Sequence, residues 1–403
     1  MNHSVTVLES LRATPRSSRV ELGRRTGLSP ATISRAIAKL KRDGLVTERP
    51  DRPTGVGRPA RVVELRPGAA YVLGIDVGGS QVRAVLVDLE GRVRASEEGP
   101  LRSSGSESSI IRQIATVAQR AQRAAGGRPV LAASAGISGI VDREAGRVLL
   151  SPDLPALTGR PVRDLLAAVL LMPVAIDNDD VLAAVGEATS GAARGCRDVV
   201  FLSLGYGLGA GLIIGGRPAR GHRSSAGAIA YLAPGSLEER ASGRVIPLLY
   251  ATARARHLGI VPARPGQATG DGPDATAPGL EASEVFTLAA TGDPIAAAVI
   301  EGVVKALGDL TVNVAALLNP EVIVLGGGLS RNERQLVDPI RQLVANQVPF
   351  APRVVTAELA SLAVARGAAH FALSLAKQQI AGQVAGQSAF VPDPARVGSL
   401  QLL

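Results

Sequence analysis

The chain has 403 residues, a formal net charge of +9 and a single cysteine, Cys196. This length is enough for two or three domains, and one cysteine excludes both an intrachain disulfide and a CxxC metal clip. The positive charge is concentrated: residues 1–70 contain fourteen Lys or Arg and six Asp or Glu, which leaves only +1 for the other 333 residues. A basic segment joined to a nearly neutral body indicates a nucleic-acid-binding module.

The sequence shows no pattern typical of export or of a membrane span. The N-terminal segment MNHSVTVLESLR lacks the basic and apolar regions of a secretory signal. The uncharged stretch Val199–Gly216 approaches membrane-spanning length, but its six glycines favour a buried β-hairpin. We therefore expect a soluble, cytoplasmic protein.

The first forty residues predict three helices, the last two of which form a helix-turn-helix. Val5–Leu11 predicts a short amphipathic helix. Ser18–Thr26 predicts the second helix, with Val20 and Leu22 available to the core, and Gly27 predicts the turn.

Ser29 and Pro30 predict the start of the third helix, as N-cap and first helical residue. Ile33, Ile37 and Leu40 then fall at i, i+4 and i+7 and are expected to face inward. Small polar and basic residues remain on the outer face, which suits the floor of a DNA major groove. We predict that four of them contact DNA: Thr32, Ser34, Arg35 and Lys39. The alternative for the two basic residues is an ordinary solvated helix face.

A wing is predicted after the third helix. Its first strand begins at Gly44-Leu45-Val46, and Val62–Leu65 can return as the second strand. Between them, the extended Gly57-Arg58-Pro59 could place Arg58 in a narrow A·T-rich minor groove. Glycine- and proline-containing linkers are common, so a plain linker is the alternative.

From Tyr71 onward the pattern changes to strands and helices of an α/β protein. The same β-β-β-α-β order occurs twice, and two related halves would leave a ligand cleft between them. The elements that define the repeat are strands at Val72–Asp76, Val82–Asp88, Val93–Ser96 and Val130–Ala135 with a helix over 106–125, then strands at Val199–Leu204, Gly209–Ile214 and Glu321–Leu325.

Six blocks in this region resemble, in order, those of the ROK family (repressor, open reading frame, kinase), in its branch with an N-terminal winged helix. They extend from residue 74 to residue 328, and six blocks in order are a far more specific match than any single glycine motif. The blocks are GIDVGG at 74–79, SPDLP at 151–155, DNDD at 177–180 with AAVGE at 183–187, GYGLGAG at 205–211, GSLEERAS at 235–242 and NPEVIVLGGG at 319–328.

The resemblance implies a role for each block. Asp76 would orient a metal-bound water, the amides of Gly78, Gly79 and Ser80 would cradle phosphate oxygens, and Asp179 would accept a sugar hydroxyl proton beside Asn178. Glycines on the other half would approach the phosphates and the adenosine: Gly205, Gly207, Gly209, Gly326 and Gly327.

Several of these parts are altered here. The family's sugar-clamping AGExGH segment has Ala228 in place of its Glu and Tyr231 in place of its sugar- and zinc-binding His. The phosphate-loop threonines become Ser80 and Tyr206, and Asp153 stands where the family usually has Asn. The cysteine-rich zinc loop is shortened, so the usual zinc ligands are missing. We predict that the protein binds no zinc and no other metal. The altered residues also give little reason to expect binding of ATP or Mg²⁺.

The surviving residues predict a sensor rather than an enzyme. A residual sugar site would consist of Asp153, Asn178, Asp179 and Glu238. Losing two charged partners of sugar hydroxyls, at roughly 1.5–3 kcal/mol each, would weaken hexose binding by powers of ten. No catalytic residue is expected, although Asp179 would be the base if the domain were active. Its alternative role is the N-cap of a helix over Val181–Ser190.

The sequence therefore predicts an α/β protein: an N-terminal winged helix-turn-helix, then a two-lobed actin/hexokinase/Hsp70-like (ribonuclease H-like) ATPase fold. The predicted domains are 1–66 for the winged helix with its wing and linker, 71–190 and 191–377 for the lobes, and 378–403 for a tail. We expect a transcriptional regulator, a repressor, that responds to a sugar-like effector. It would bind an inverted-repeat operator with A·T-rich flanks as a homodimer or homotetramer. The alternatives are a DNA-binding sugar kinase and a regulator controlled by a protein partner.

Overall fold

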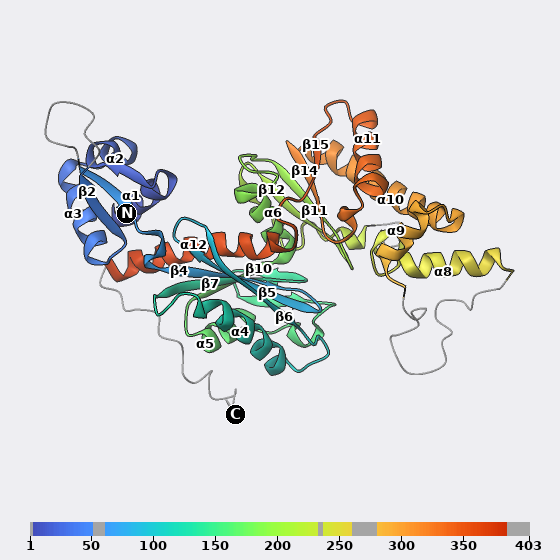
Figure 1. The fold of residues 1–403 in the computed structure, drawn as a ribbon, viewed down its shortest axis with the longest axis horizontal. Helices are drawn as coiled ribbons and strands as arrows, with labels where there is room; N and C mark the ends of the chain where they lie inside the picture. Colours follow the sequence, from blue (N-terminus) through green and yellow to red (C-terminus); the bar gives the residue numbers. More distant parts are fainter. Residues whose placement is uncertain (1–2, 51–60, 233–236, 260–279, 385–403) are drawn as a thin grey trace. The chain divides into compact units, whose positions relative to one another are not determined.

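The computed structural model describes residues 3–50, 61–232, 237–259 and 280–384, with side chains described up to 377 (Figure 1). It divides into two compact units, Met1–Asp179 with Val364–Leu403, and Asp180–Ala363. The predicted boundary differs from this division, because the sequence placed residues up to 377 in the second lobe. The last helix instead packs within the first unit.

The N-terminal part of the first unit is a winged helix. Three helices pack on a small antiparallel sheet whose strand order is β1-β3-β2. The elements are α1 (His3–Ala13), β1 (Arg16–Ser18), α2 (Arg19–Thr26), α3 (Pro30–Arg42), β2 (Val46–Pro50) and β3 (Arg61–Leu65).

The predicted helix signals are confirmed. Ser18 and Glu21 form a capping box at the start of α2, and Gly27 ends this helix with a φ of 69°. Ser29 caps α3 by accepting the backbone N–H of Thr32, with Pro30 in the first helical position. Local sequence therefore determines where both helices of the motif begin.

The core of the winged helix contains most of the predicted residues, including Leu22, Ile33, Ile37 and Leu40. The prediction for Val20 was wrong, since this side chain is 71% exposed. Two residues along a helix correspond to a rotation of about 200°, so burial of Leu22 turns Val20 toward solvent.

The first unit also contains a five-stranded mixed sheet with the order β10-β7-β4-β5-β6. Helix α4 and helix α5 cover one face, where Leu73, Ile75 and Leu86 pack against isoleucines such as Ile110 and Ile114. The elements are β4 (Tyr71–Val77), β5 (Gln81–Asp88), β6 (Val93–Pro100), α4 (Glu107–Arg123), β7 (Val130–Ile137), β8 (Ile140–Asp142), β9 (Arg147–Leu150), α5 (Val162–Leu170) and β10 (Val174–Asn178).

Helix α12 (Ala363–Val384) lies against the other face of this sheet and reaches the winged helix (Figure 1). Its backbone touches β4 at Gly74, where a Cβ atom would lie 2.0 Å from the carbonyl oxygen of Ala365 and 2.6 Å from the nitrogen of Ala369. Only glycine allows this approach. The helix extends past Lys377, where the sequence predicted a tail.

The second unit contains a sheet with the corresponding order, β13-β12-β11-β14-β15. In both sheets an antiparallel hairpin leads into parallel strands, which confirms the predicted repeat. The elements are α6 (Asp179–Ser190), β11 (Val199–Leu204), β12 (Leu208–Ile214), β13 (Arg217–Pro218), α7 (Leu237–Ala241), α8 (Ile246–His257), α9 (Ala282–Ala290), α10 (Pro294–Leu318), β14 (Val322–Gly326), α11 (Asp338–Gln347) and β15 (Arg353–Thr356).

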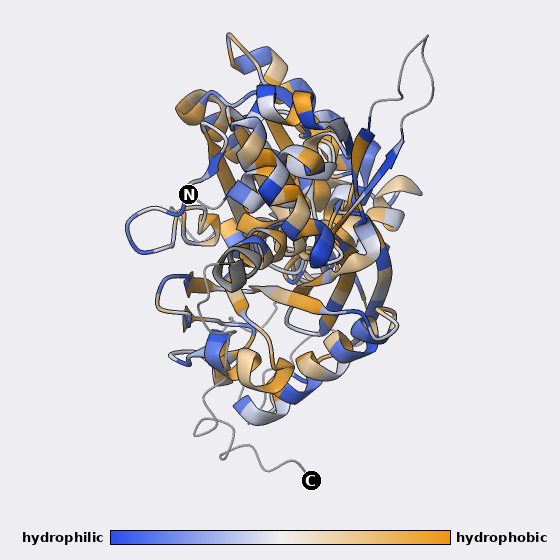
Figure 2. Cartoon of the chain, turned by 90° about the vertical axis from the view of Figure 1, so that its left-hand side faces the viewer, coloured by the Kyte–Doolittle hydropathy of each residue, from blue (hydrophilic) through white to orange (hydrophobic). Residues whose placement is uncertain are grey.

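Several helices carry both hydrophobic and hydrophilic residues along their length (Figure 2). In α4, for example, Ile110 and Ile114 are fully buried whereas Arg112 is exposed. This is the pattern of helices that cover a sheet with one face. Over the described residues, no helix has the length and apolar character needed to cross a membrane.

Candidate DNA interface and kinase-like residues

The recognition helix α3 presents the predicted DNA-contacting residues in different environments. Arg35 is exposed, whereas Thr32, Ser34 and Lys39 are half-buried. The hydroxyl of Thr32 lies 2.9 Å from that of Ser29, and the Lys39 amine lies 3.9 Å from the Asp43 carboxylate. Arg58 lies outside the described residues. The roles of these residues in binding DNA stay predictions.

Ser34 is tied to the preceding helix. The Nη1 group of Arg19, the first residue of α2, donates a hydrogen bond of 2.9 Å to the Ser34 hydroxyl oxygen. The same guanidinium binds Glu48 on the first wing strand, through Nε at 2.8 Å and Nη2 at 3.2 Å. Arg19 thus connects both helices of the motif to the wing, a role that sequence reasoning missed.

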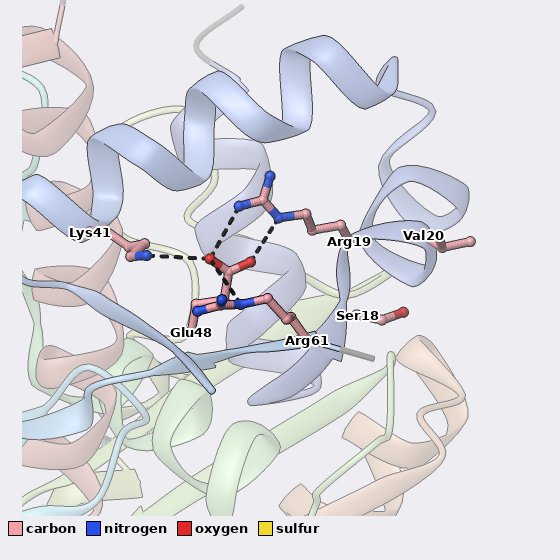
Figure 3. Close-up of a pocket in the computed structure, with 6 residues that line it drawn as sticks. All are labelled: Ser18, Arg19, Val20, Lys41, Glu48 and Arg61. Carbon is pink, nitrogen blue, oxygen red and sulfur yellow. Dashed lines mark hydrogen bonds and ion pairs between the residues drawn. The ribbon is translucent and has the colours of Figure 1, made fainter. Parts of the chain in front are cut away.

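An open pocket of about 470 Å³ surrounds this contact (Figure 3). Figure 3 shows the Glu48 carboxylate at its centre, with dashed lines to three basic side chains. Besides Arg19, Lys41 Nζ lies 3.3 Å and Arg61 Nε lies 3.9 Å from the Glu48 carboxylate. The Arg19 hydrogen bond is the main cause that lowers the pKa of Glu48, and Lys41 adds to it. The acid therefore stays ionised beside them.

Glu48 reaches the pocket from the core-facing side of the wing. It shares that side of β2 with Val46, and its partner across the strand pair is Val63, both buried. The Glu48 side chain is 5% exposed. An acidic residue therefore occupies a position where the pattern of the strand favours an apolar one.

In the larger domain, Asp76 at the end of β4 is buried beside a base. Arg83 on the neighbouring strand approaches Asp76 Oδ2 to 3.5 Å and Glu98 Oε2 to 3.5 Å. The adjoining turn closes through a 3.0 Å hydrogen bond from the Gly78 N–H to the Gln81 carbonyl. Both the carboxylate and this amide are thus engaged within the protein.

Three of the four predicted sugar-site residues gather around the turn at Ser138-Gly139. The Ser138 hydroxyl donates to Asp153 Oδ2 at 2.8 Å. The side-chain amide of Asn178 donates to the Gly139 carbonyl at 2.8 Å and to Asp179 Oδ1 at 2.9 Å. Gly79 borders the same group, because a Cβ there would lie 3.1 Å from the Asp153 Cβ. The sequence did not predict this turn.

In the second unit, acidic side chains lie against the glycine loop 205–211. Glu238 Oε2 accepts the backbone N–H of Leu208 at 2.9 Å, and Glu238 Oε1 would lie 3.1 Å from a Cβ at Gly207. Asp180 also borders the loop, since a Cβ at Gly209 would lie 1.8 Å from its Oδ2. Gly205 bonds to Gly207 within the loop.

Asp180 is a further residue that sequence reasoning did not single out. Burial raises its pKa to about 6, although a hydrogen bond with Ser203 acts in the opposite direction. It belongs to the DNDD block, so its position was known but its burial was not.

Gly326 and Gly327 are required by internal packing at the end of β14. A Cβ at Gly326 would lie 2.3 Å from the Phe201 ring. Gly327 has a φ of 83°, and a Cβ there would lie 2.4 Å from the Leu204 carbonyl oxygen. These glycines therefore have a structural explanation that does not depend on a nucleotide. Within the described residues, no group of three or more His, Cys, Asp or Glu is arranged to hold a metal ion.

Comparison with known proteins matches both modules. The ROK family pattern matches residues 72–377, and a winged helix-turn-helix DNA-binding pattern matches residues 5–47. A glucokinase from Streptomyces coelicolor is 30% identical over 319 residues, covering 74% of this chain and 96% of that protein. A xylose repressor from Caldicellulosiruptor bescii is 25% identical over 343 residues, covering 83% of this chain and 84% of the repressor.

Among solved structures, a ROK family transcriptional regulator, a homologue of the E. coli MLC protein, superposes with a TM-score of 0.74 at 23% identity. The match covers 93% of this chain and 96% of that chain and thus includes both modules. A ROK family glucokinase from Streptomyces griseus, in complex with glucose and AMPPNP, gives 0.62 at 28% identity over 75% of this chain and 99% of its own. The predicted fold, a winged helix-turn-helix followed by a sugar-kinase-like α/β domain, is confirmed.

Proposed function

The chain belongs to the ROK family, and we propose that it is a DNA-binding transcriptional repressor whose kinase-like domain binds a sugar-like effector without phosphorylating it. The observation that carries the proposal is that residues expected to bind metal and phosphate are engaged by other side chains of the protein. Asp76 is paired with Arg83, and the glycine loop of the second unit is lined by Glu238 and Asp180.

These residues fit Mg²⁺ and a nucleotide poorly. An aspartate that serves a metal ion needs free carboxylate oxygens, whereas Arg83 lies 3.5 Å from Asp76. A phosphate-binding loop offers free backbone N–H groups in a positive environment. Here Glu238 accepts the Leu208 N–H, and Asp180 adds a second acid beside Gly209. Like charges in such a setting would repel a triphosphate.

The residues of the proposed effector site remain polar. Asp153, Asn178 and Asp179 surround the Ser138-Gly139 turn, and their carboxylate and amide groups suit sugar hydroxyls. Glu238 is the fourth predicted member. Xylose repressor relatives support a sugar as the effector class.

A DNA-binding sugar kinase is the second candidate, favoured by the retained Asp179 and by glucokinase relatives of 30% identity. An assay that couples ADP release to a panel of hexoses, pentoses and amino sugars separates the two. We expect no turnover above background. Clear turnover that Asp179→Asn abolishes would establish the kinase instead.

DNA binding is tested by selecting duplexes from a random library with purified, nucleic-acid-free protein. We expect an inverted repeat with A·T-rich flanks, bound by a homodimer or homotetramer whose mass analytical ultracentrifugation gives. Arg35→Ala should weaken binding of the selected duplex far more than of a scrambled one, because base contacts carry specificity. Arg58→Ala should reduce the preference for the flanks. Absence of any selected sequence would refute the repressor proposal.

Thermal shifts across a metabolite panel address the effector. A shift with a sugar or sugar derivative supports effector binding. No shift with any compound would favour control by a protein partner.

A further inference from the structure

The pocket in Figure 3 contains an acid, Glu48, whose side chain is 5% exposed and lies beside three basic side chains. We propose that Glu48 is a positioning residue for DNA binding, which holds Arg19, Lys41 and Arg61 as one site for phosphates of the DNA backbone. This inference rests on the proposed DNA-binding function and identifies how one part of the DNA is held.

The charges of the pocket favour an anion. The side chains of Arg19, Lys41 and Arg61 are 41%, 42% and 58% exposed, whereas that of Glu48 is 5% exposed. Three cations therefore face solvent around one acid that points inward. Arg19 directs three of its five N–H donors to Glu48 and Ser34, and Lys41 directs one of three to Glu48. Within the described residues, the remaining donors of these two side chains are left for phosphate oxygens.

The three bases come from elements that flank the expected path of a DNA strand. Arg19 is the first residue of α2, Lys41 lies in the last turn of α3, and Arg61 begins β3 directly after the wing segment. When a recognition helix lies in the major groove, the preceding helix crosses the DNA backbone. A wing that reaches the adjacent minor groove leaves one backbone strand between the two. In that arrangement the pocket would lie along that strand.

The position of Glu48 in the sheet also suits an apolar residue. Its neighbours on the inner face are Val46 and Val63, and an apolar residue could complete this face. Replacing buried ion pairs with apolar side chains is often neutral or stabilising. The carboxylate holds the three basic side chains in place before DNA binds. Without it, they would have to be immobilised on binding.

The first experiment measures how binding depends on salt. Arg19→Ala, Lys41→Ala and Arg61→Ala are titrated against the selected operator and a scrambled duplex over a series of KCl concentrations. A variant that no longer neutralises one phosphate should show a slope of log K against log[salt] that is smaller by about 0.9 on both duplexes. Lys305→Ala on α10 removes the same charge from the second unit, outside the DNA-binding module, and should leave the slope unchanged. Wild-type slopes in all three pocket variants would overturn the proposal.

The second experiment tests the positioning role. Glu48→Gln removes a negative charge, so simple attraction predicts tighter DNA binding. Positioning predicts the opposite, a loss of operator affinity of roughly three- to tenfold for each side chain that must be ordered anew. Glu48→Leu should show the same loss of operator affinity, and its melting temperature should equal that of the wild type. Glu64→Gln, which removes an acid paired with Arg16 and Arg49 on the same strand pair, is the matched control and should not weaken binding.

The outcomes distinguish a failure of the proposed DNA-binding function from a failure of the role of Glu48. Operator affinity in Glu48→Gln and Glu48→Leu that equals or exceeds that of the wild type overturns the role of Glu48. If the wild-type protein binds no duplex, the proposed function itself fails. If it binds and the pocket variants match it in slope and affinity, only this inference fails.

Discussion

Asp180 has its carboxyl group against Gly209, where burial raises its pKa to about 6 from an ordinary value of 3.8. The folded protein therefore holds this proton more tightly than the unfolded chain does. The stability that the protonated form contributes is present below about pH 4 and is lost as the pH rises through about 6. At neutral pH, the ionised carboxylate is a local cost to folding.

Asp180→Asn should remove that cost. We expect its free energy of unfolding to exceed that of the wild type by about 2 kcal/mol near pH 7, and to differ little near pH 4. Urea denaturation at the two pH values measures the difference. Asp309→Asn, in an exposed ion pair with Lys305, is the control and should change little at either pH. An equal change at both pH values would contradict the argument.

Single residues were predictable where a motif fixes them and not where packing does. The blocks identified Asn178, Asp179 and Asp153, which the structure brings to one turn. Glu48 was not predicted, because its meaning depends on three bases from α2, α3 and β3. Neither was the Asp76–Arg83 pair, since alternation within a strand does not specify its neighbour across the sheet.

At the scale of elements, Glu187 at the end of the AAVGE block connects α6 to the segment before α12. It is fully buried and accepts the backbone N–H groups of Ala192, Glu358 and Leu359 at 2.8, 3.2 and 2.9 Å. The carboxylate thereby satisfies donors that no regular element satisfies. It also holds the backbone at 358–359 to the end of α6.

Glu187→Ala should therefore be strongly destabilising. Leaving buried N–H groups without an acceptor costs about 1–3 kcal/mol each, so we expect a loss of roughly 3 kcal/mol or more in the free energy of unfolding. Thermal and urea denaturation measure it. Glu358→Ala, beside the same contact, keeps the backbone donors paired and serves as the control. A loss below about 1 kcal/mol in Glu187→Ala would show that water or rearrangement replaces the carboxylate.

Local signals located most elements but missed two. Caps and periodicity placed α2 and α3, whereas β1 has only three residues, Arg16–Ser18, and forms through pairing with β3. The last helix was missed as a packing element because its alanine-rich face has weak amphipathic character. The residue that its close packing requires is Gly74, which lies about 290 residues earlier in the chain.

At the scale of the whole first unit, α12 meets the winged helix at a titratable residue. Burial, and then the charges of Arg12 and Lys377, lower the pKa of His370 to about 4 from 6.5. Between about pH 4 and pH 6.5, His370 therefore binds a proton in the unfolded chain but not in the folded protein. The stability due to neutral His370 is present above about pH 6.5 and is lost as the pH falls toward 4.

The free energy of unfolding of the wild type should fall, through His370, by on the order of 3 kcal/mol between pH 7 and pH 4. We expect His370→Leu to lack this decrease. Denaturation of both proteins over that range measures it. His222→Gln, at an exposed histidine, should keep the wild-type profile. Parallel pH profiles for His370→Leu and the wild type would refute the assignment.

The same junction makes α12 the structural link between the sheet and the winged helix. Leu373 and Ala376 on α12 line a small cavity with Leu8 of α1, Leu65 of β3 and Leu89 after β5. Lys377 Nζ adds an ion pair with Glu9 at 3.1 Å, which contributes little because both groups are near solvent. The apolar packing therefore holds the module in place.

Leu373→Ala should enlarge that cavity and destabilise the protein by about 2–5 kcal/mol. Because the cavity borders the winged helix, amide hydrogen exchange should accelerate in α1 and β3 more than in α4. Leu317→Ala, at an 84% exposed position on α10, is the matched control and should alter neither measurement.

If α12 transmits effector binding to DNA affinity, Leu373→Ala should also reduce the ratio of DNA affinities with and without effector. The reason is that a loosened junction transmits less of any difference between the two states. Uniform acceleration of exchange in α1, β3 and α4 would show instead that the junction is no weaker than the rest of the unit.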